Sequence, residues 1–294
     1  MGRRAPILLT VVALLAAVMP LPAQRIAKRI FIEAVDDQGQ PLLNLTAADL
    51  TIIEDGSPRD VTRVTPGTVP MRIALVVDSS TSTAPMMTIF RQALVEFADA
   101  LPPPHEVVFV SSGSQIRVRT PPSTDRQQLK TAIGMLASEG GANAFLETVI
   151  ETDARFLKTA APQWPVFVIL TTDIGEVRRE PDIPRYHRFM NDFLARGGNA
   201  HAIVMQGKQF GPVTDITQNL VQNLDGIYLS LVVDSGLPYR LRSIAERVAA
   251  DHRKMATWHE VEFTGESTLL QPTIEVGVNG DGVRVRMSAR RPAH

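Results

Sequence analysis

The 294-residue sequence contains no cysteine, few aromatic residues and no excess of charge of either sign. Without cysteine the chain has no disulfides, no thiolate metal ligands and no cysteine nucleophile. A formal net charge of −1 lacks the basic excess of a nucleic-acid-binding surface, and an aromatic content of 5% offers little for stacking on bases. A hydrophobic content of 44% and a charged content of 21% are typical of a packed globular protein.

The chain also lacks an apolar run long enough to span a bilayer. It opens with MGRR, continues with an apolar segment at residues 7–19 and then has a short segment of small residues and proline. This order is typical of a secretory signal, and the apolar segment is shorter than the roughly 20 residues that cross a membrane. We expect residues 1–23 to be removed by cleavage near Ala23, which leaves a periplasmic or secreted protein without a membrane span. A leader that is kept would instead be a membrane anchor.

Residues 24–70 contain short apolar segments separated by turn signals. Ile30–Val35 meets DDQGQP, and Leu50–Ile53 ends at an Asp-Gly pair. These patterns predict short β-strands, but the region is too small to bury a core of its own. Residues 265–294 return to alternating polarity around NGDG, which is a hairpin signal. We therefore predict that both chain ends build one small, immunoglobulin-like β module, with a C-terminal β-hairpin.

Residues 71–264 differ, because apolar segments here alternate with segments of helical period. Strands are expected at Ile73–Val77, Val107–Val110, Pro165–Thr171, Ala202–Met205, Ile227–Leu231 and Val261–Phe263. Strands that are apolar on both faces and separated by helices predict an α/β fold with a Rossmann-like, doubly wound, mostly parallel sheet. In such sheets ligands bind beyond the carboxyl ends of the strands.

The segment RIALVVDSSTS ends the first of these strands with Asp78 and a run of hydroxyl side chains. Three interpretations compete. Hydroxyl residues between a strand and a helix are common caps, and Asp at a strand end tethers turns. An exposed serine could be a nucleophile, but a hydrolase elbow would read GxSxG, whereas residues 111–115 read SSGSQ and the six histidines are scattered. Carboxylate and hydroxyl oxygens could also hold a hard cation.

The same segment resembles the DxSxS motif of von Willebrand factor A (VWFA) domains, with Asp78, Ser80 and Ser82 at the motif positions. PPSTDRQQLKTAI, EGGANAFLET and FVILTTDIGE follow in the order of later family segments, and the last two resemble the GGTxLxDA loop and the LLTDG strand end. The resemblance covers Met71–Thr264, and the leader and tail are similar to those of a bacterial exported subfamily. It implies a VWFA-like fold and a non-enzymatic function in protein–protein interaction or adhesion.

The resemblance further implies a metal-ion-dependent adhesion site (MIDAS). An ion, Mg²⁺ or Mn²⁺, would be held by five residues, namely Asp78, Ser80, Ser82, Asn143 and Asp173. Asp173 would act through a water, and a carboxylate of a protein partner would complete the coordination. The sequence departs from the family where Ala142 or Asn143 replaces the loop threonine and where Ile174 replaces a glycine; of the first two, Asn143 could offer a carbonyl oxygen. The alternative is a scaffold of the same fold that works without an ion.

Overall fold

A computed structural model describes residues 26–158, 163–175, 182–207, 211–232, 234–266 and 272–292. The predicted leader and its cleavage near Ala23 lie outside the described residues. Among the residues that are described, no helix is long and apolar enough to cross a membrane.

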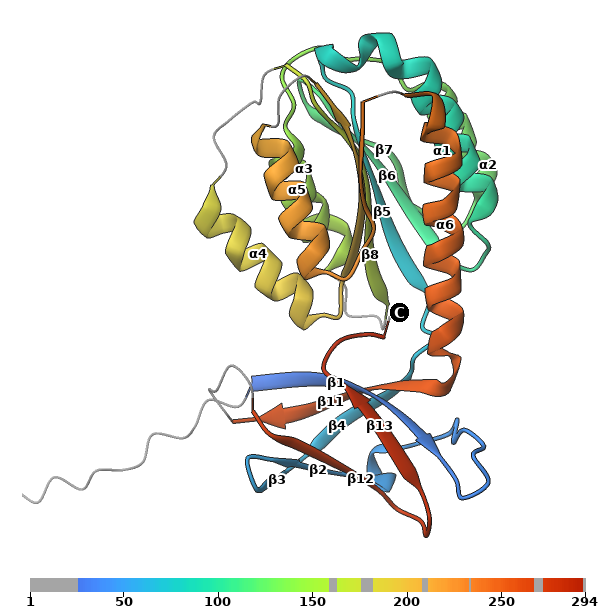
Figure 1. Ribbon diagram of the computed structural model, residues 1–294, viewed down its shortest axis with the longest axis vertical. Helices are drawn as coiled ribbons and strands as arrows, with labels where there is room; N and C mark the ends of the chain where they lie inside the picture. The colour runs from blue at the N-terminus through green and yellow to red at the C-terminus, as the bar shows by residue number, and fades with distance from the viewer. Residues whose placement is uncertain are drawn as a thin grey trace, which may run out of the picture.

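The larger body of the protein contains a six-stranded sheet with the order β10-β9-β8-β5-β6-β7 (Figure 1). Its strands are β5 (Met71–Asp78), β6 (Glu106–Ser112), β7 (Ile116–Ser123), β8 (Trp164–Asp173), β9 (Asn199–Gln206) and β10 (Tyr228–Leu231). All neighbouring pairs are parallel except β6 with β7. The predicted Rossmann-like, mostly parallel sheet is therefore confirmed.

Helices cover both faces of this sheet (Figure 1). They are α1 (Met87–Ala100), α2 (Arg126–Gly134), α3 (Phe145–Thr152), α4 (Ile183–Ala195), α5 (Pro212–Asn223) and α6 (Leu237–Lys254). Ile73 and Leu75 of β5 pack with α1, α2 and α6, whereas Ala74 and Val76 pack with α3, α4 and α5. Both faces of β5 are thus buried, which explains why it is apolar at nearly every position.

Five short helical segments complete the connections. They are η1 (Ala47–Asp49), η2 (Thr81–Met86), the π-helical η3 (Asp153–Leu157), η4 (Asp234–Gly236) and η5 (Met255–Thr257). The η2 segment leads from β5 into α1, so the residues after Asp78 lie at the carboxyl edge of the sheet.

The smaller body is a β module of two packed sheets, with the strand orders β13-β1-β11-β4 and β12-β2-β3. Its strands are β1 (Ile26–Val35), β2 (Leu50–Glu54), β3 (Ser57–Arg59), β4 (Val61–Pro66), β11 (Trp258–Gly265), β12 (Ile274–Val278) and β13 (Arg284–Ser288). The core between the sheets is formed by Ile30, Ile32, Leu50, Ile52, Val261 and Phe263. Both chain ends contribute to it, as the sequence predicts.

One strand lies outside the sheet for which it was predicted. We expected Val261–Phe263 to complete the α/β series, but β11 pairs antiparallel with β1 and β4 in the β module. Val261 and Phe263 enter the core of the module, whereas Glu260 and Glu262 alternate with them and form ion pairs instead. This alternation is typical of an antiparallel strand with one core face, so β11 belongs to the module.

The two C-terminal strands also pair differently from the prediction. NGDG connects β12 to β13, but β12 pairs with β2 in one sheet and β13 pairs with β1 in the other. The predicted hairpin pairing is therefore wrong. The turn, in which Gly280 and Gly282 have φ values of 131° and 74°, carries the chain across the sandwich. Each strand satisfies backbone groups along the edge of an N-terminal strand that would otherwise remain unpaired.

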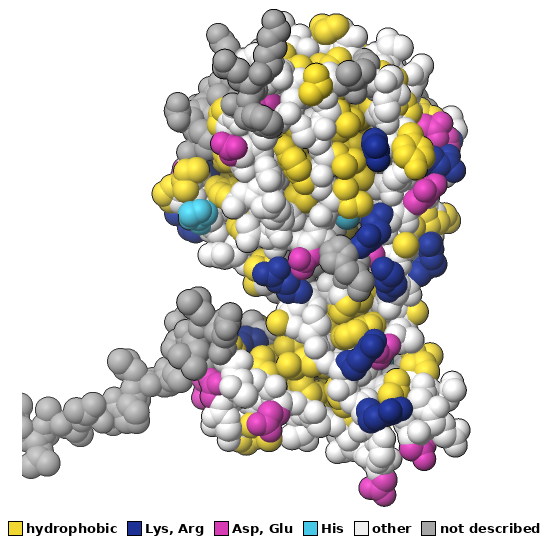
Figure 2. Space-filling model, in the orientation of Figure 1, with side chains coloured by type: hydrophobic (Ala, Val, Ile, Leu, Met, Phe, Trp, Pro, Cys, Tyr) yellow, Lys and Arg dark blue, Asp and Glu magenta, His cyan; other side chains and the backbone are white. Residues whose placement is uncertain are grey.

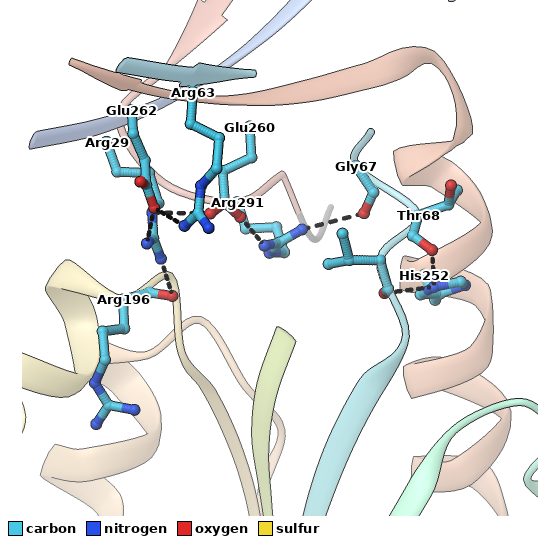
Figure 3. Close-up of polar contacts among 10 residues, drawn as sticks. Arg29, Arg63, Gly67, Thr68, Arg196, His252, Glu260, Glu262 and Arg291 are labelled. Atoms are coloured by element: carbon cyan, nitrogen blue, oxygen red, sulfur yellow. Dashed lines mark hydrogen bonds and ion pairs between the residues drawn. The ribbon is translucent and has the colours of Figure 1, made fainter. Parts of the chain in front are cut away.

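The β module packs against the edge at which the parallel strands begin, opposite their carboxyl ends (Figure 1). In Figure 2 the two bodies meet at a narrower join, around which Lys and Arg side chains gather on this face. Arg291 is 6% exposed and lies between the rings of Phe31 from β1 and Trp164 from β8, 4.7 and 4.6 Å from their centroids. It also donates to the Gly67 carbonyl and pairs with Glu260 (Figure 3). One side chain therefore contacts both bodies.

Further polar contacts surround Arg291 at this join (Figure 3). Arg29 donates to the carbonyl of Arg196, after α4, at 2.7 Å, and to Glu262 at 2.5 Å. Arg63 from β4 donates to the same carboxylate at 2.5 Å. The bond from Arg29 to Arg196 ties the β module to the α/β body directly.

Candidate functional site

Asp78 is the centre of the polar cluster at the carboxyl end of β5. The residue is 2% exposed. Its Oδ1 accepts the backbone N–H of Ser80 at 2.8 Å, and its Oδ2 accepts the Thr172 hydroxyl at 2.5 Å, the Thr172 N–H at 3.2 Å and the Asn143 amide at 3.0 Å. Burial raises the pKa of Asp78, and hydrogen bonds from Thr172 and Ser80 oppose that rise. Four donors thus hold the carboxylate.

The hydroxyls of Ser80 and Ser82 lie beside this carboxylate. Their Oγ atoms are 2.9 Å apart, and Ser82 Oγ lies 3.1 Å from Thr172 Oγ1. Thr83 donates its hydroxyl to the Ser80 carbonyl at 2.7 Å, which fixes the turn into η2. A surface pocket, called the loop pocket below, is lined by Ser80, Thr81, Ser82, Gly141, Ala142 and Gly175. The structure therefore brings the DxSxS residues together at an accessible surface.

The loop before α3 shows which of Ala142 and Asn143 lies at the pocket, where the family has its loop threonine. Ala142 lines the loop pocket beside the serines, whereas Asn143 is 4% exposed and is hydrogen-bonded beneath the surface. The residue that faces the pocket in this loop therefore has no side-chain oxygen.

Asn143 presents its amino group to the carboxylate. Its Nδ2 donates to Asp78 Oδ2, to Thr171 Oγ1 at 2.9 Å and to the Thr172 carbonyl at 2.8 Å. Its Oδ1 accepts the backbone N–H of Phe145, the first residue of α3, at 2.9 Å. The oxygen that was predicted to bind an ion instead accepts this N–H, which is otherwise free at the start of the helix, and an ion-binding role of Asn143 stays a prediction.

Asp173 ends β8 but is directed to α5. Its Oδ2 accepts the backbone N–H groups of Gly211 at 2.6 Å and of Thr214 at 3.1 Å. A carboxylate at this position satisfies free N–H groups and interacts favourably with the helix dipole. In this structure Asp173 thus caps α5 through Oδ2, and its role beside an ion, through a water, stays a prediction. Ile174 follows, and Gly175, with φ of 87°, forms the turn one residue later than in the family pattern.

These residues do not fit an octahedral Mg²⁺ or Mn²⁺ site. Mg²⁺ needs six oxygens at about 2.0–2.1 Å, which places neighbouring ligands about 2.9 Å apart. The separation of Ser80 Oγ and Ser82 Oγ, 2.9 Å, matches that spacing. Asp173 Oδ2, however, accepts from the start of α5, and both oxygens of Asp78 already accept hydrogen bonds from the protein. Of the side chains described around the loop pocket, those with oxygen carry neutral hydroxyls.

Sequence reasoning missed two residues of this cluster. Thr172 donates to Asp78, and Thr171 accepts from Asn143. Both stand in the quoted segment FVILTTDIGE, directly before Asp173. Because β5 and β8 are parallel neighbours, with Val77 opposite Leu170, their carboxyl ends meet at one edge. The pair of threonines next to the motif Asp was the signal that could have identified them.

The histidines give the serines no general base. Those that the structure describes lie on other elements: His105 before β6, His187 on α4, His201 on β9, His252 on α6 and His259 on β11. None of them lines the loop pocket, and the serine hydroxyls contact each other and Thr172. Activation of a serine nucleophile requires an adjacent base, so the described site does not support a hydrolase.

The sequence matches no protein-family model and no curated protein. Among solved structures the fold is similar to a von Willebrand factor type A protein from Catenulispora acidiphila, with a TM-score of 0.53, 12% identity and coverage of 89% of this chain and 74% of that one. An aerotolerance-related membrane protein from Bacteroides fragilis NCTC 9343 has a TM-score of 0.46 at 12% identity, over 60% and 99% of the two chains.

A further structure, proximal thread matrix protein 1 from the mussel byssus with a zinc-occupied MIDAS motif, has a TM-score of 0.49 and 14% identity, over 62% of this chain and 48% of that one. At these identities the likeness concerns the fold alone. The match to the C. acidiphila protein covers more of the chain than the α/β body contains, so it extends into the β module. The fold of this chain is that of the von Willebrand factor type A proteins, as its motifs predict.

Proposed function

We propose that this chain is an exported, non-catalytic protein-binding module whose recognition surface is the loop pocket. The observation that carries the proposal is the position of that pocket, which lies at the carboxyl edge of a VWFA-like sheet, where ligands of such sheets bind. The leader-like N-terminus supports export.

The chemistry of the loop pocket favours binding over catalysis. Thr81, which is exposed, and Ser82, which is partly exposed, offer hydroxyls that can donate to and accept from a partner. Gly141, Ala142 and Gly175 are small, so a partner's backbone can approach closely. The buried carboxylate of Asp78 holds the serine loop in place through the Ser80 N–H. A rigid polar pocket without an adjacent base suits recognition of a protein surface.

In this proposal the partner binds without an ion, as in the scaffold alternative, but it binds at the loop pocket and not at the helical or β-module surfaces. The ion-dependent alternative, in which a partner carboxylate completes a Mg²⁺ or Mn²⁺ site, is supported by one observation, the 2.9 Å spacing of Ser80 Oγ and Ser82 Oγ. The two mechanisms differ in their response to a chelator.

The test is to fill the loop pocket. Thr81 is exposed and lines it, whereas Thr131 is equally exposed on α2. Three proteins are compared: the mature wild type, Thr81→Trp and Thr131→Trp. Each is tested for the envelope proteins that it captures in solution, and again for those that it captures in the cell through a photo-cross-linker. We expect a partner that binds the wild type and Thr131→Trp but not Thr81→Trp. Equal capture by all three would contradict the proposed surface.

The capture of the partner by the wild type is then repeated after a chelator has removed divalent cations. Binding that survives the chelator supports the ion-independent mechanism. Binding that disappears with chelator and returns with Mn²⁺ would instead favour the carboxylate-and-ion alternative at the same pocket.

A further inference from the structure

We infer that the side-chain amide of Asn143 takes the structural place of the divalent cation, so that the loop edge is organised without an ion. This inference shares the site of the proposed function, but it concerns how the loops are held and not what they bind. Partner capture at the loop pocket and ion dependence of the fold are separate measurements, so either can fail alone.

The amide connects the segments that a central ion would connect. Its Nδ2 bonds to the end of β5 through Asp78 and to the end of β8 through Thr171 and Thr172, while its Oδ1 bonds to the start of α3 through Phe145. A cation would attract the same carboxylate and carbonyl oxygens. The N–H groups of the amide do so here without adding charge.

The orientation of the amide is fixed by its partners. The Thr172 carbonyl is an acceptor only and lies 2.8 Å from Nδ2, and the Phe145 N–H is a donor only and lies 2.9 Å from Oδ1. Exchanging nitrogen and oxygen would place two acceptors together and two donors together. The amino group must therefore face Asp78.

The neighbouring position agrees with this assignment. Ala142 brings no oxygen to the pocket, and Asp173 is held by Gly211 and Thr214 at the start of α5. Two departures from an ion site, at Ala142 and Asp173, thus occur together with one compensating donor, the amide of Asn143.

The experiment compares thermal unfolding of the mature wild type, Asn143→Asp and Asn191→Asp in chelator and in millimolar Mg²⁺ or Mn²⁺. Asn143→Asp keeps the shape of the side chain but replaces the donor that faces Asp78 by a second carboxylate. Asn191→Asp makes the same chemical change at an exposed position on α4. Calorimetric titration with Mn²⁺ measures binding directly.

We expect the wild-type melting temperature to change by less than about 1 °C between chelator and ion, because an ion that does not bind cannot stabilise. Asn143→Asp should melt lower than Asn191→Asp in chelator and recover by about 5 °C with Mn²⁺, because only a cation can now bridge the two carboxylates. The inference is overturned if the wild type gains about 5 °C with ion and Ser82→Ala abolishes the gain, or if Asn143→Asp in chelator is as stable as Asn191→Asp.

Discussion

Asp78 holds the loop edge together at the scale of a single residue. Replacing it by Ala leaves the Asn143 amide and the Thr172 hydroxyl and N–H without their shared acceptor. Because hydrogen bonds to a buried charge are strong and their unpaired donors are costly, we expect Asp78→Ala to lower the free energy of unfolding by about 3 kcal/mol in urea. Asp99→Ala, which removes an exposed ion pair with Lys130, should cost less than about 1 kcal/mol. Equal losses would contradict this role.

His105 makes the fold sensitive to acid. It is 2% exposed, and burial, with His252 and Arg126 nearby, lowers its pKa from 6.5 to about 4. Between these values the unfolded chain binds a proton that the folded chain does not. Neutral His105 therefore makes its full contribution to the free energy of unfolding above about pH 6.5. This contribution, about 3 kcal/mol in total, is lost as the pH falls toward 4.

Urea unfolding at a series of pH values checks this prediction. The variant His105→Gln should lose less stability between about pH 7 and about pH 4 than the wild type, since glutamine does not titrate. The matched variant His187→Gln, at an exposed position on α4, should keep the wild-type slope. A His105→Gln curve parallel to that of the wild type would disprove the assignment.

The sequence predicted which residues lie at the loop edge, but not the direction in which their side chains point. The motif spacing placed Asp78, Ser80 and Ser82 together, because a short loop after a buried strand leaves few alternatives. The partner of Asn143 and the direction of Asp173 depend on contacts with α3 and α5, which come from distant segments. The local sequence around each residue does not specify those contacts, so the direction of these two side chains could not be predicted.

At the scale of elements, Asp173 links the end of β8 to the start of α5. A Cβ atom on Gly211 would lie 2.4 Å from Asp173 Oδ1, so the two positions are coupled. We expect Asp173→Ala to cost about 1 kcal/mol through loss of the cap and Gly211→Ala to disturb the same cap sterically.

A double-mutant cycle measures this coupling. The combined variant Asp173→Ala, Gly211→Ala should lose less than the sum of the single losses, because removing the carboxylate removes the clash. Hydrogen exchange of the first-turn amides of α5 should rise in each single variant. Strict additivity would show that the cap and the glycine act independently.

The elements themselves were predicted best where packing repeats a simple pattern. The inner strands of the six-stranded sheet, β5, β6, β8 and β9, were located because burial on both faces makes them largely apolar. β11 was assigned to the wrong sheet, although the alternation of Val261 and Phe263 with two glutamates predicts a one-faced strand. The pairing of β12 and β13 could not be derived from NGDG, because a turn signal does not specify which edges are available.

At the scale of the whole molecule, the join between the two bodies depends on Arg291, the fourth residue from the end of the sequence. Nothing in the local sequence distinguishes it from Arg290 beside it. The difference arises only in three dimensions, where Arg291 is buried between two rings, whereas Arg290 forms an ion pair with Asp225 at 50% side-chain exposure. Burial lowers the pKa of Arg291 to about 10, so it stays charged at neutral pH.

These neighbours provide a matched pair of variants for the last prediction. Arg291→Met keeps much of the apolar volume but removes one of the two arginines that pair with the Glu260 carboxylate, Arg29 being the other. We therefore expect a loss of about 2 to 3 kcal/mol in urea and faster proteolysis of the Gly67–Pro70 connection. Arg290→Met should cost less than about 1 kcal/mol. Adding Glu260→Gln to Arg291→Met should restore part of the loss, because it removes a carboxylate that has lost one of its two cationic partners. If Arg290→Met and Arg291→Met lower the free energy of unfolding equally, and Glu260→Gln gives no rescue, then apolar packing joins the two bodies and the contacts of Arg291 do not.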